Sequence, residues 1–257
     1  MKSRLKNVEG DIVASDQMYV EAARSNSLHT LNPRQFSSDP EVTNPEMISL
    51  YKNGMVRRQG PGRPIYDEII LAARHGLCPL CGQRQVSTLD HHLPKSLFPH
   101  LVVNPHNLVP ACSDCNKAKL DTAPSCSEDE TLHPYFDDIE NDLWLKAKVL
   151  ENKPTALVFY VSPPEEWDDT MKERVKRHFR TFGLASLYAA QAAYELNNIK
   201  FHLEQLYHSN IANGAVLIRD HLRSQAASRH RVHINSWQSA TYHALADSDW
   251  YCDGGFS

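Results

Sequence analysis

The sequence lacks a long hydrophobic run: none approaches the roughly 20 apolar residues that a membrane-spanning helix needs. Its amino terminus, MKSRLKNVEGDIVASDQ, is charged and has no apolar core segment, so neither a signal peptide nor a transit peptide is supported. Internal repeats and low-complexity segments are absent as well. We therefore expect a cytoplasmic protein without a membrane partner.

The sequence also lacks an excess of positive charge. Its 257 residues carry a formal net charge of −4, which argues against a protein that coats nucleic acid indiscriminately, because phosphates are bound mainly by Lys and Arg. The charge is segregated, however. Residues 121–170 hold 13 Asp and Glu against 3 Lys and Arg, whereas residues 171–233 hold 10 Lys and Arg against 4 Asp and Glu. Any nucleic-acid contact is expected to be local, on a basic face of the second half, where Arg174 is one of the candidates.

Hydrophobic spacing predicts an α+β fold in three parts. Residues 1–64 are expected to form an N-terminal arm and connector, with one short helix around residues 19–24 followed by a segment rich in Pro, Ser and Asn. Residues 65–125 are expected to form the domain that carries the chemistry. Residues 126–257 are expected to add a β-hairpin, from 143–150 and 156–161, and a mainly helical C-terminal region.

Within residues 65–125 the predicted order is helix, strand, loop, strand, helix. The first helix is expected over residues 65–75, with Ile65, Ile69 and Ala73 on its apolar face and Gly76 ending it. Residues 86–93 and 107–112 are rich in strand-forming residues. Ser113 is placed to cap a helix that follows.

Four of the six cysteines form two Cys-x-x-Cys pairs, Cys78 with Cys81 and Cys112 with Cys115. In a reducing compartment this spacing favours metal ligation over disulfides, because two sulfurs so spaced reach one tetrahedral metal. Four thiolates fill the coordination shell, so the predicted metal is a structural Zn²⁺. Buried free cysteines or a redox motif are the weaker alternatives.

The segment between and just after the two pairs gathers residues suited to phosphodiester hydrolysis: Asp90, His91, His92, Asn107 and Asn116. This reaction needs an activated water, neutralised phosphoryl charge and a stabilised leaving oxygen. His91 has a side chain that can accept a proton near neutral pH, as a general base must. Asp90 and Asn116 offer hard oxygen ligands suited to Mg²⁺ or Mn²⁺.

Three short motifs carry a family resemblance. Asp-His-x-x-Pro at 90–94, Asn-Leu-Val at 107–109 and Cys-x-x-Cys-Asn-x-x-Lys at 112–119 together resemble the bacterial HNH endonuclease family in its four-cysteine form. The signature covers about residues 77–120, and the segment HPYFDD at 133–138 resembles a flank seen in some bacterial HNH proteins. The resemblance implies a zinc-stapled strand-strand-helix unit of the ββα-metal type.

The resemblance also implies roles for individual residues. His91 is expected to be the base, and Asp90 and Asn116 the ligands of a catalytic divalent metal. Asn107 is expected to tie down the loop between the strands and to help orient the base. Lys119 is a candidate for contacting phosphate or for stabilising the helix.

Because two histidines are adjacent, the motif leaves open which of them is the general base. In some HNH relatives the first of two histidines binds the metal and the second is the base, which here would make His91 a ligand and His92 the base. An imidazole ligand would favour Zn²⁺, Ni²⁺ or Co²⁺ at the active site. Pro94 follows His91 by three residues, as in the Asp-His-x-x-Pro version, and this favours His91 as the base.

The predicted function is that of a metal-dependent endonuclease that cleaves DNA. The resemblance implies a setting in bacterial defence against phage, beside an ATPase partner. An RNA-directed HNH nuclease is one alternative, and a non-catalytic, zinc-stabilised nucleic-acid-binding or scaffold module is another. A pure binding module has no need of His91 or Asn116, so their presence at this spacing favours the enzyme.

Overall fold

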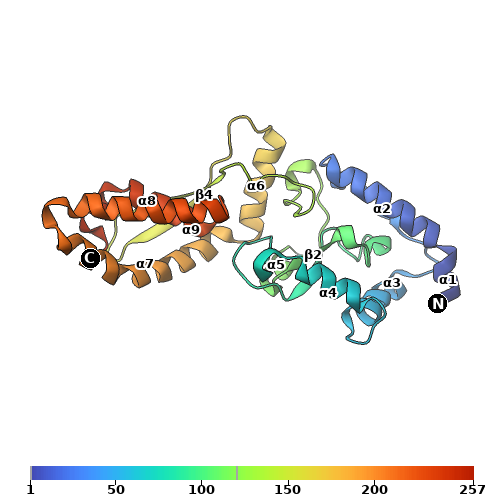
Figure 1. Cartoon of the computed structure of the whole chain (residues 1–257). Helices are drawn as coiled ribbons and strands as arrows, with labels where there is room; N and C mark the ends of the chain where they lie inside the picture. The colour runs from blue at the N-terminus through green and yellow to red at the C-terminus, as the bar shows by residue number, and fades with distance from the viewer. Residues whose placement is uncertain (1, 120) are drawn as a thin grey trace. The chain divides into compact units, whose positions relative to one another are not determined.

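A computed structural model describes residues 2–119 and 121–257 (Figure 1). The chain divides into two compact units, Met1–Asp137 and Asp138–Ser257. Its fold is α+β: the described residues are mostly helical and form two small antiparallel sheets of two strands each. No helix in the described part is long and apolar enough to cross a membrane.

The first unit begins with helices that the sequence indicated only in part. The short helix expected around residues 19–24 is the end of the longer helix α2, and the expected connector contains helix α3. Helix α3 begins with a capping box, in which the Glu46 side chain accepts from the backbone N–H of Thr43. The helices in this part are α1 (Lys2–Asn7), α2 (Glu9–Arg24), α3 (Asn44–Leu50) and a π-helical turn, Tyr51–Val56.

The helix expected over residues 65–75 is shorter, and its apolar face differs in part from the predicted one: Ile69 packs against the core as expected, but Ile65 does not. Helix α4 spans Arg63–Leu71, and the chain turns extended at Ala73 before the left-handed Gly76, whose φ is +68°. Tyr66 is the buried side chain of this helix, whereas Ile65 is 47% exposed. Tyr66 buries the larger apolar surface, so the helix rotates to place Tyr66 inward.

A strand pair followed by a short helix forms the centre of the first unit. Strand β1 (Thr88–His91) pairs antiparallel with β2 (Leu108–Ala111), with Asp90 opposite Val109. Helix α5 (Ser113–Ala118) follows β2 at once. Its N-cap is Cys112 and not Ser113 as predicted, because the Cys112 sulfur accepts the backbone N–H of Cys115 at 3.4 Å.

Two apolar clusters join the N-terminal helices to the strands and to the loop between them. The first brings residues 8–66 onto β1 and β2, and the second packs α2 against the loop 93–101. The first consists of Val8, Val42, Met47, Tyr51, Met55, Tyr66, Leu89, Val102 and Leu108. The second consists of Tyr19, Ala22, Ala23, Leu28, Phe36, Leu93, Phe98 and Leu101. Residues before 64 thus form part of the core around the candidate site.

The second unit contains the predicted hairpin and helices. Strand β3 (Leu145–Leu150) pairs antiparallel with β4 (Ala156–Val161). Gly183 has a φ of +59° and separates the first two helices, a conformation that glycine adopts without strain. The helices are α6 (Asp169–Thr181), α7 (Leu184–Ser209), α8 (Gly214–Val232), α9 (Trp237–Asp247) and a terminal π-helical turn, Tyr251–Gly255.

Candidate metal centre and active site

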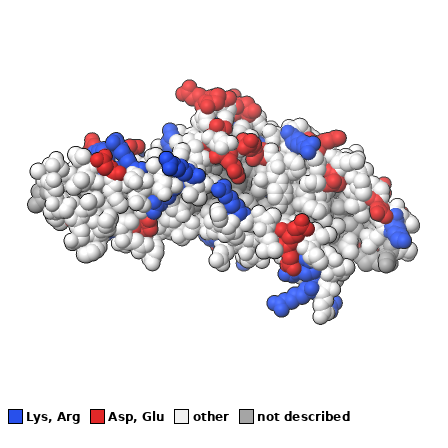
Figure 2. Space-filling view, viewed as in Figure 1, with Lys and Arg blue, Asp and Glu red and all other residues white. Residues whose placement is uncertain are grey.

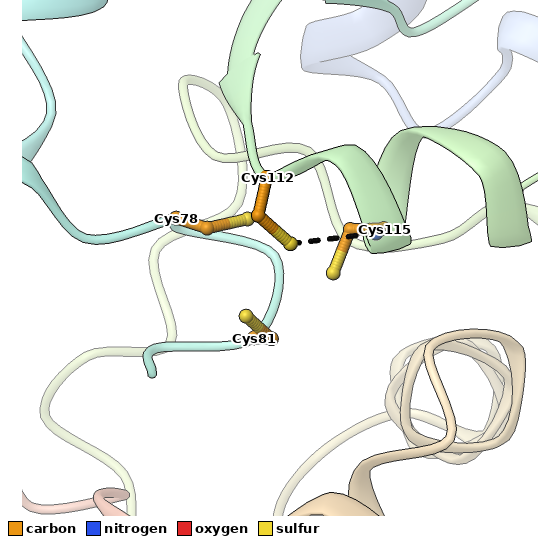
Figure 3. Close-up of side chains that lie close together, drawn as sticks. All are labelled: Cys78, Cys81, Cys112 and Cys115. Atoms are coloured by element: carbon orange, nitrogen blue, oxygen red, sulfur yellow. Dashed lines mark hydrogen bonds between the residues drawn. The ribbon is translucent and has the colours of Figure 1, made fainter. Parts of the chain in front are cut away.

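Four buried cysteine side chains meet between the segment after α4 and the start of α5. Cys78 and Cys81 come from the first segment, Cys112 directly follows β2 and Cys115 lies in α5. Their sulfur atoms all lie within 4.8 Å of one another, and Figure 3 shows the four side chains gathered from the two segments. The four cysteines are therefore arranged to hold a metal and are compatible with a structural zinc ion.

Local backbone geometry places the first two sulfurs. The Cys78 carbonyl accepts the backbone N–H groups of Cys81 at 3.3 Å and of Gly82 at 2.7 Å, and Gly82 has a φ of +61°. This tight turn directs both side chains to one side. The hydrogen bonds that Cys115 shares with Cys78 and Cys81 raise the pKa of the Cys115 thiol. A cation is therefore needed before all four sulfurs can be thiolates, and zinc suits this donor set.

His91 lies at the end of β1 with one ring nitrogen anchored. Its Nε2 donates to the Val102 carbonyl at 2.9 Å, and its ring packs edge-on against Tyr51 with centroids 4.6 Å apart. The side chain is buried, and this burial lowers the pKa of His91 to about 4. His91 is thus neutral at physiological pH. Because a carbonyl only accepts, Nε2 holds the proton and Nδ1 holds the lone pair that could take up another.

Asp90 is buried beside Lys119. The Asp90 Oδ2 lies 2.9 Å from the Lys119 Nζ, and each side chain is 9% exposed. Burial raises the pKa of Asp90, while the charge of Lys119 opposes that rise. Lys119 also donates to the carbonyl of His91, and to that of His92 at 2.7 Å. The ammonium group therefore contacts the backbone that carries the two histidines as well as the carboxylate.

Asn107 is completely buried directly before β2 and holds the loop between the strands. Its Oδ1 accepts the backbone N–H of Leu93 at 2.6 Å, and its Nδ2 donates to the carbonyls of Leu93 at 3.1 Å and Leu101 at 3.3 Å. Its own carbonyl accepts the backbone N–H of His92 at 2.8 Å. Residues 93–101 are tied to β2 through this one side chain.

Asn116 lies on α5 directly after Cys115 and is half-buried. Among the described residues, none hydrogen-bonds its side-chain amide, while its backbone N–H donates to the Cys112 carbonyl at 3.1 Å. Helix α5 packs beside β1. The cysteine cluster and the Asp90 strand are thus joined to the same short helix that carries Asn116.

His92 packs inside the first unit and does not face solvent. It is 8% exposed, and its ring lies 4.1 Å from that of His133, centroid to centroid. The Tyr19 hydroxyl is 2.8 Å from the Nε2 of His133, and the Tyr135 hydroxyl donates to the Leu108 carbonyl at 2.8 Å. The segment HPYFDD therefore lies against the strand pair.

Several residues that contact the candidate site gave no signal in the sequence. Tyr51 packs on the His91 ring, the Val102 carbonyl anchors it, and Tyr19 contacts His133. Tyr51 and Tyr19 precede His91 by dozens of residues, in a stretch without a clear period. The only sequence signal in this group is the HPYFDD segment itself.

The predicted basic face of the second unit is interrupted. Arg174 is 1% exposed and does not line an open groove as expected, because it lies on the buried face of α6, one turn before the buried His178. Arg219 pairs with Asp249 at 2.6 Å, and Lys176 pairs with Glu173 at 2.7 Å. On the face seen in Figure 2, Lys and Arg side chains lie among Asp and Glu side chains.

Comparisons with known proteins find two relatives that match parts of the chain. Protein ea31 of Escherichia phage lambda is 32% identical over 162 residues, which cover 62% of this chain and 54% of that protein. Septu protein PtuB of Bacillus thuringiensis is 32% identical over 111 residues, which cover 39% of this chain and 42% of that protein. No family model matches the chain, and no solved structure matches it. The chain thus spans about half the length of the curated relatives that it matches, one from a phage and one from a bacterium.

Proposed function

We propose that the chain is a metal-dependent DNA endonuclease of the HNH type. The observation that carries the proposal is the placement of His91, whose imidazole is anchored through Nε2 to the Val102 carbonyl at the end of β1, next to Asp90. The order β1, β2, α5, with a four-cysteine cluster at the start of α5, supports a ββα-metal unit. The partial similarity to Septu protein PtuB is compatible with this proposal.

In the proposed reaction His91 acts as the general base. A water oxygen forms a bond to phosphorus, and a water proton passes to the Nδ1 of His91. The bond from phosphorus to the 3′ oxygen breaks, and the 3′ oxygen leaves with the electron pair and takes a proton from solvent. The hydrogen bond from Nε2 to the Val102 carbonyl holds the ring so that Nδ1 carries the lone pair. Asn107 holds both ends of the loop 93–101, and this loop leads directly into Val102.

Asp90 and Asn116 are the proposed ligands of one divalent metal. They are a carboxylate and an amide, on β1 and α5, which lie in contact, and such oxygen donors suit Mg²⁺ or Mn²⁺. When bound, the metal would neutralise charge on the phosphoryl and leaving oxygens. The alternative with His92 as the base is less well supported, because its ring packs against His133.

The proposed test compares cleavage of a plasmid and of a structured RNA in Mg²⁺, Mn²⁺ or EDTA. We expect DNA cleavage that EDTA abolishes and that His91→Ala lowers by about 10²–10⁴-fold, the usual worth of a general base. His92→Ala and the exposed control His202→Ala should keep cleavage. Equal rates for the wild type and His91→Ala would refute the assignment.

The same assay separates the alternatives. Cleavage of RNA alone would favour an RNA-directed nuclease, and binding without cleavage in every metal would favour a non-catalytic module. Bacterial defence against phage, beside an ATPase partner, is the setting proposed for the endonuclease. It predicts that expression of the wild type lowers phage plaque numbers when the partner is present and that His91→Ala does not.

A further inference from the structure

Lys119 follows the end of α5 and is turned into the protein. Its side chain is 9% exposed, and its Nζ lies 2.9 Å from the Oδ2 of Asp90. The same Nζ donates to the carbonyls of His91 and His92. Three consecutive residues at the end of β1 thus supply acceptors to one ammonium group.

These contacts use the full hydrogen-bonding capacity of the side chain. A lysine ammonium has three N–H donors and no acceptor, and three acceptors surround this one. A buried ammonium is stable only when it is paired and hydrogen-bonded, as it is here. No donor is left over for a phosphate group, so the contacts argue against the phosphate role considered for Lys119.

The position of Lys119 joins the two elements that carry the proposed catalytic groups. Asn116 lies three residues before Lys119, one helical turn away. The Lys119 ammonium group contacts Asp90 and the carbonyl of His91 on β1. Lys117, on the same helix, is exposed and shows the ordinary position of a lysine here. A single side chain therefore ties α5 to the end of β1.

We infer that Lys119 is a positioning residue that holds Asp90, the His91 backbone and α5 in one fixed arrangement. The three contacts of the Lys119 ammonium group, with Asp90 and with the carbonyls of His91 and His92, are called the Lys119 clamp below. The effect of this clamp on catalysis rests on the proposed function, whereas the clamp itself is a property of the fold. Loss of the clamp lets Asp90 and His91 move relative to Asn116. Displacements of about 1 Å at a catalytic site cost on the order of 10²-fold in rate.

The test uses three variants of the full chain: Lys119→Met, which removes the charge and the donors, Lys119→Arg, and the matched control Lys117→Met. The first measurement is independent of activity and follows backbone hydrogen exchange of residues 91–93 by NMR. We expect exchange at least about tenfold faster in Lys119→Met and unchanged in Lys117→Met. Lys119→Arg should protect these amides only partly, because a planar guanidinium does not fit three acceptors arranged around one nitrogen.

The second measurement separates kcat from KM for plasmid cleavage. Lys119→Met should lower kcat by about 10²-fold at unchanged KM for DNA, with an unchanged dependence on salt. A phosphate contact would instead raise KM and reduce the slope of log affinity against log salt concentration by about one. That result, with normal hydrogen exchange and normal kcat, would overturn the inference. If the wild type cleaves nothing, the proposed function fails, while the exchange measurement still decides whether the clamp exists.

A double variant guards against simple misfolding. Lys119→Met leaves the Asp90 carboxylate buried without its partner, which strongly destabilises such sites. Asp90→Asn with Lys119→Met removes both charges, so it should fold with normal zinc content and yet keep fast exchange at residues 91–93. Slow, wild-type exchange in this double variant would contradict the positioning role.

Discussion

Asn107→Ala tests how much the hydrogen bonds of one buried amide contribute to the first unit. The change leaves the backbone N–H of Leu93 buried without its acceptor, which costs about 1–3 kcal/mol, and the Leu93 carbonyl without a donor, which costs about 1 kcal/mol more. The Leu101 carbonyl still accepts the backbone N–H of Asn104 at 3.2 Å, so it adds little. The expected loss is about 2–4 kcal/mol, a large share of the roughly 5–15 kcal/mol that stabilises a domain.

The assay exploits the placement of the tryptophans. All four, Trp144, Trp167, Trp237 and Trp250, lie in the unit Asp138–Ser257, whereas the four-cysteine cluster lies in the other unit. Urea unfolding followed by zinc release, with a chelating dye, therefore reports the first unit, and tryptophan fluorescence reports the second. We expect Asn107→Ala to shift the zinc-release transition and to leave the fluorescence transition in place.

Asn116→Ala is the matched control, because it makes the same chemical change in the same unit. Asn116 is half-buried and its amide is not hydrogen-bonded within the described residues, so stability should stay within about 0.5 kcal/mol of the wild type. Cleavage should nevertheless be lost if Asn116 is a metal ligand. A zinc-release midpoint for Asn107→Ala that matches the Asn116→Ala midpoint would refute the reasoning.

Four further predictions concern the metal, pH, the second unit and the predicted domain boundaries. Cys78→Ser should lose zinc and unfold the first unit, because a structural zinc contributes about 10–16 kcal/mol to folding. The control Cys126→Ser, which changes an exposed cysteine outside the cluster, should keep its zinc and its fold. A folded, zinc-loaded Cys78→Ser would contradict a structural zinc at this site. Between pH 6.5 and about 4, His91 binds a proton in the unfolded chain but stays neutral in the folded one. The free energy of unfolding of the first unit should therefore fall by about 3 kcal/mol as pH falls through this window. Denaturant titrations should show a smaller loss in His91→Gln, and equal pH slopes would show that His91 is not the cause. A fragment of residues 138–257 should be helical by circular dichroism and unfold cooperatively, whereas a disordered fragment would show that this unit depends on the first. If the boundaries predicted at residues 64 and 125 mark separable domains, limited proteolysis should cut near them.

Several elements could be predicted because their signals are local. The spacing of the cysteine pairs and the hairpin of β3 and β4 each depend on residues close together in the sequence. The apolar face of α4 was predicted correctly at Ile69 and wrongly at Ile65, since the choice between Ile65 and Tyr66 depends on what packs against the helix. The contribution of residues before 64 to the core could not be predicted, because their apolar residues are irregularly spaced and gather only in the folded chain.

The candidate site divides in the same way. The sequence alone determined which residues stand together along the chain: the two Cys-x-x-Cys pairs, Asp90 next to His91, and Asn116 after the last cysteine. Only the tertiary structure decided that His91 is anchored and neutral, that His92 packs on His133, and that Lys119 points inward to Asp90. Protonation, tautomer and side-chain direction depend on desolvation and on hydrogen-bond partners such as Val102, and folding brings these partners together from distant parts of the chain.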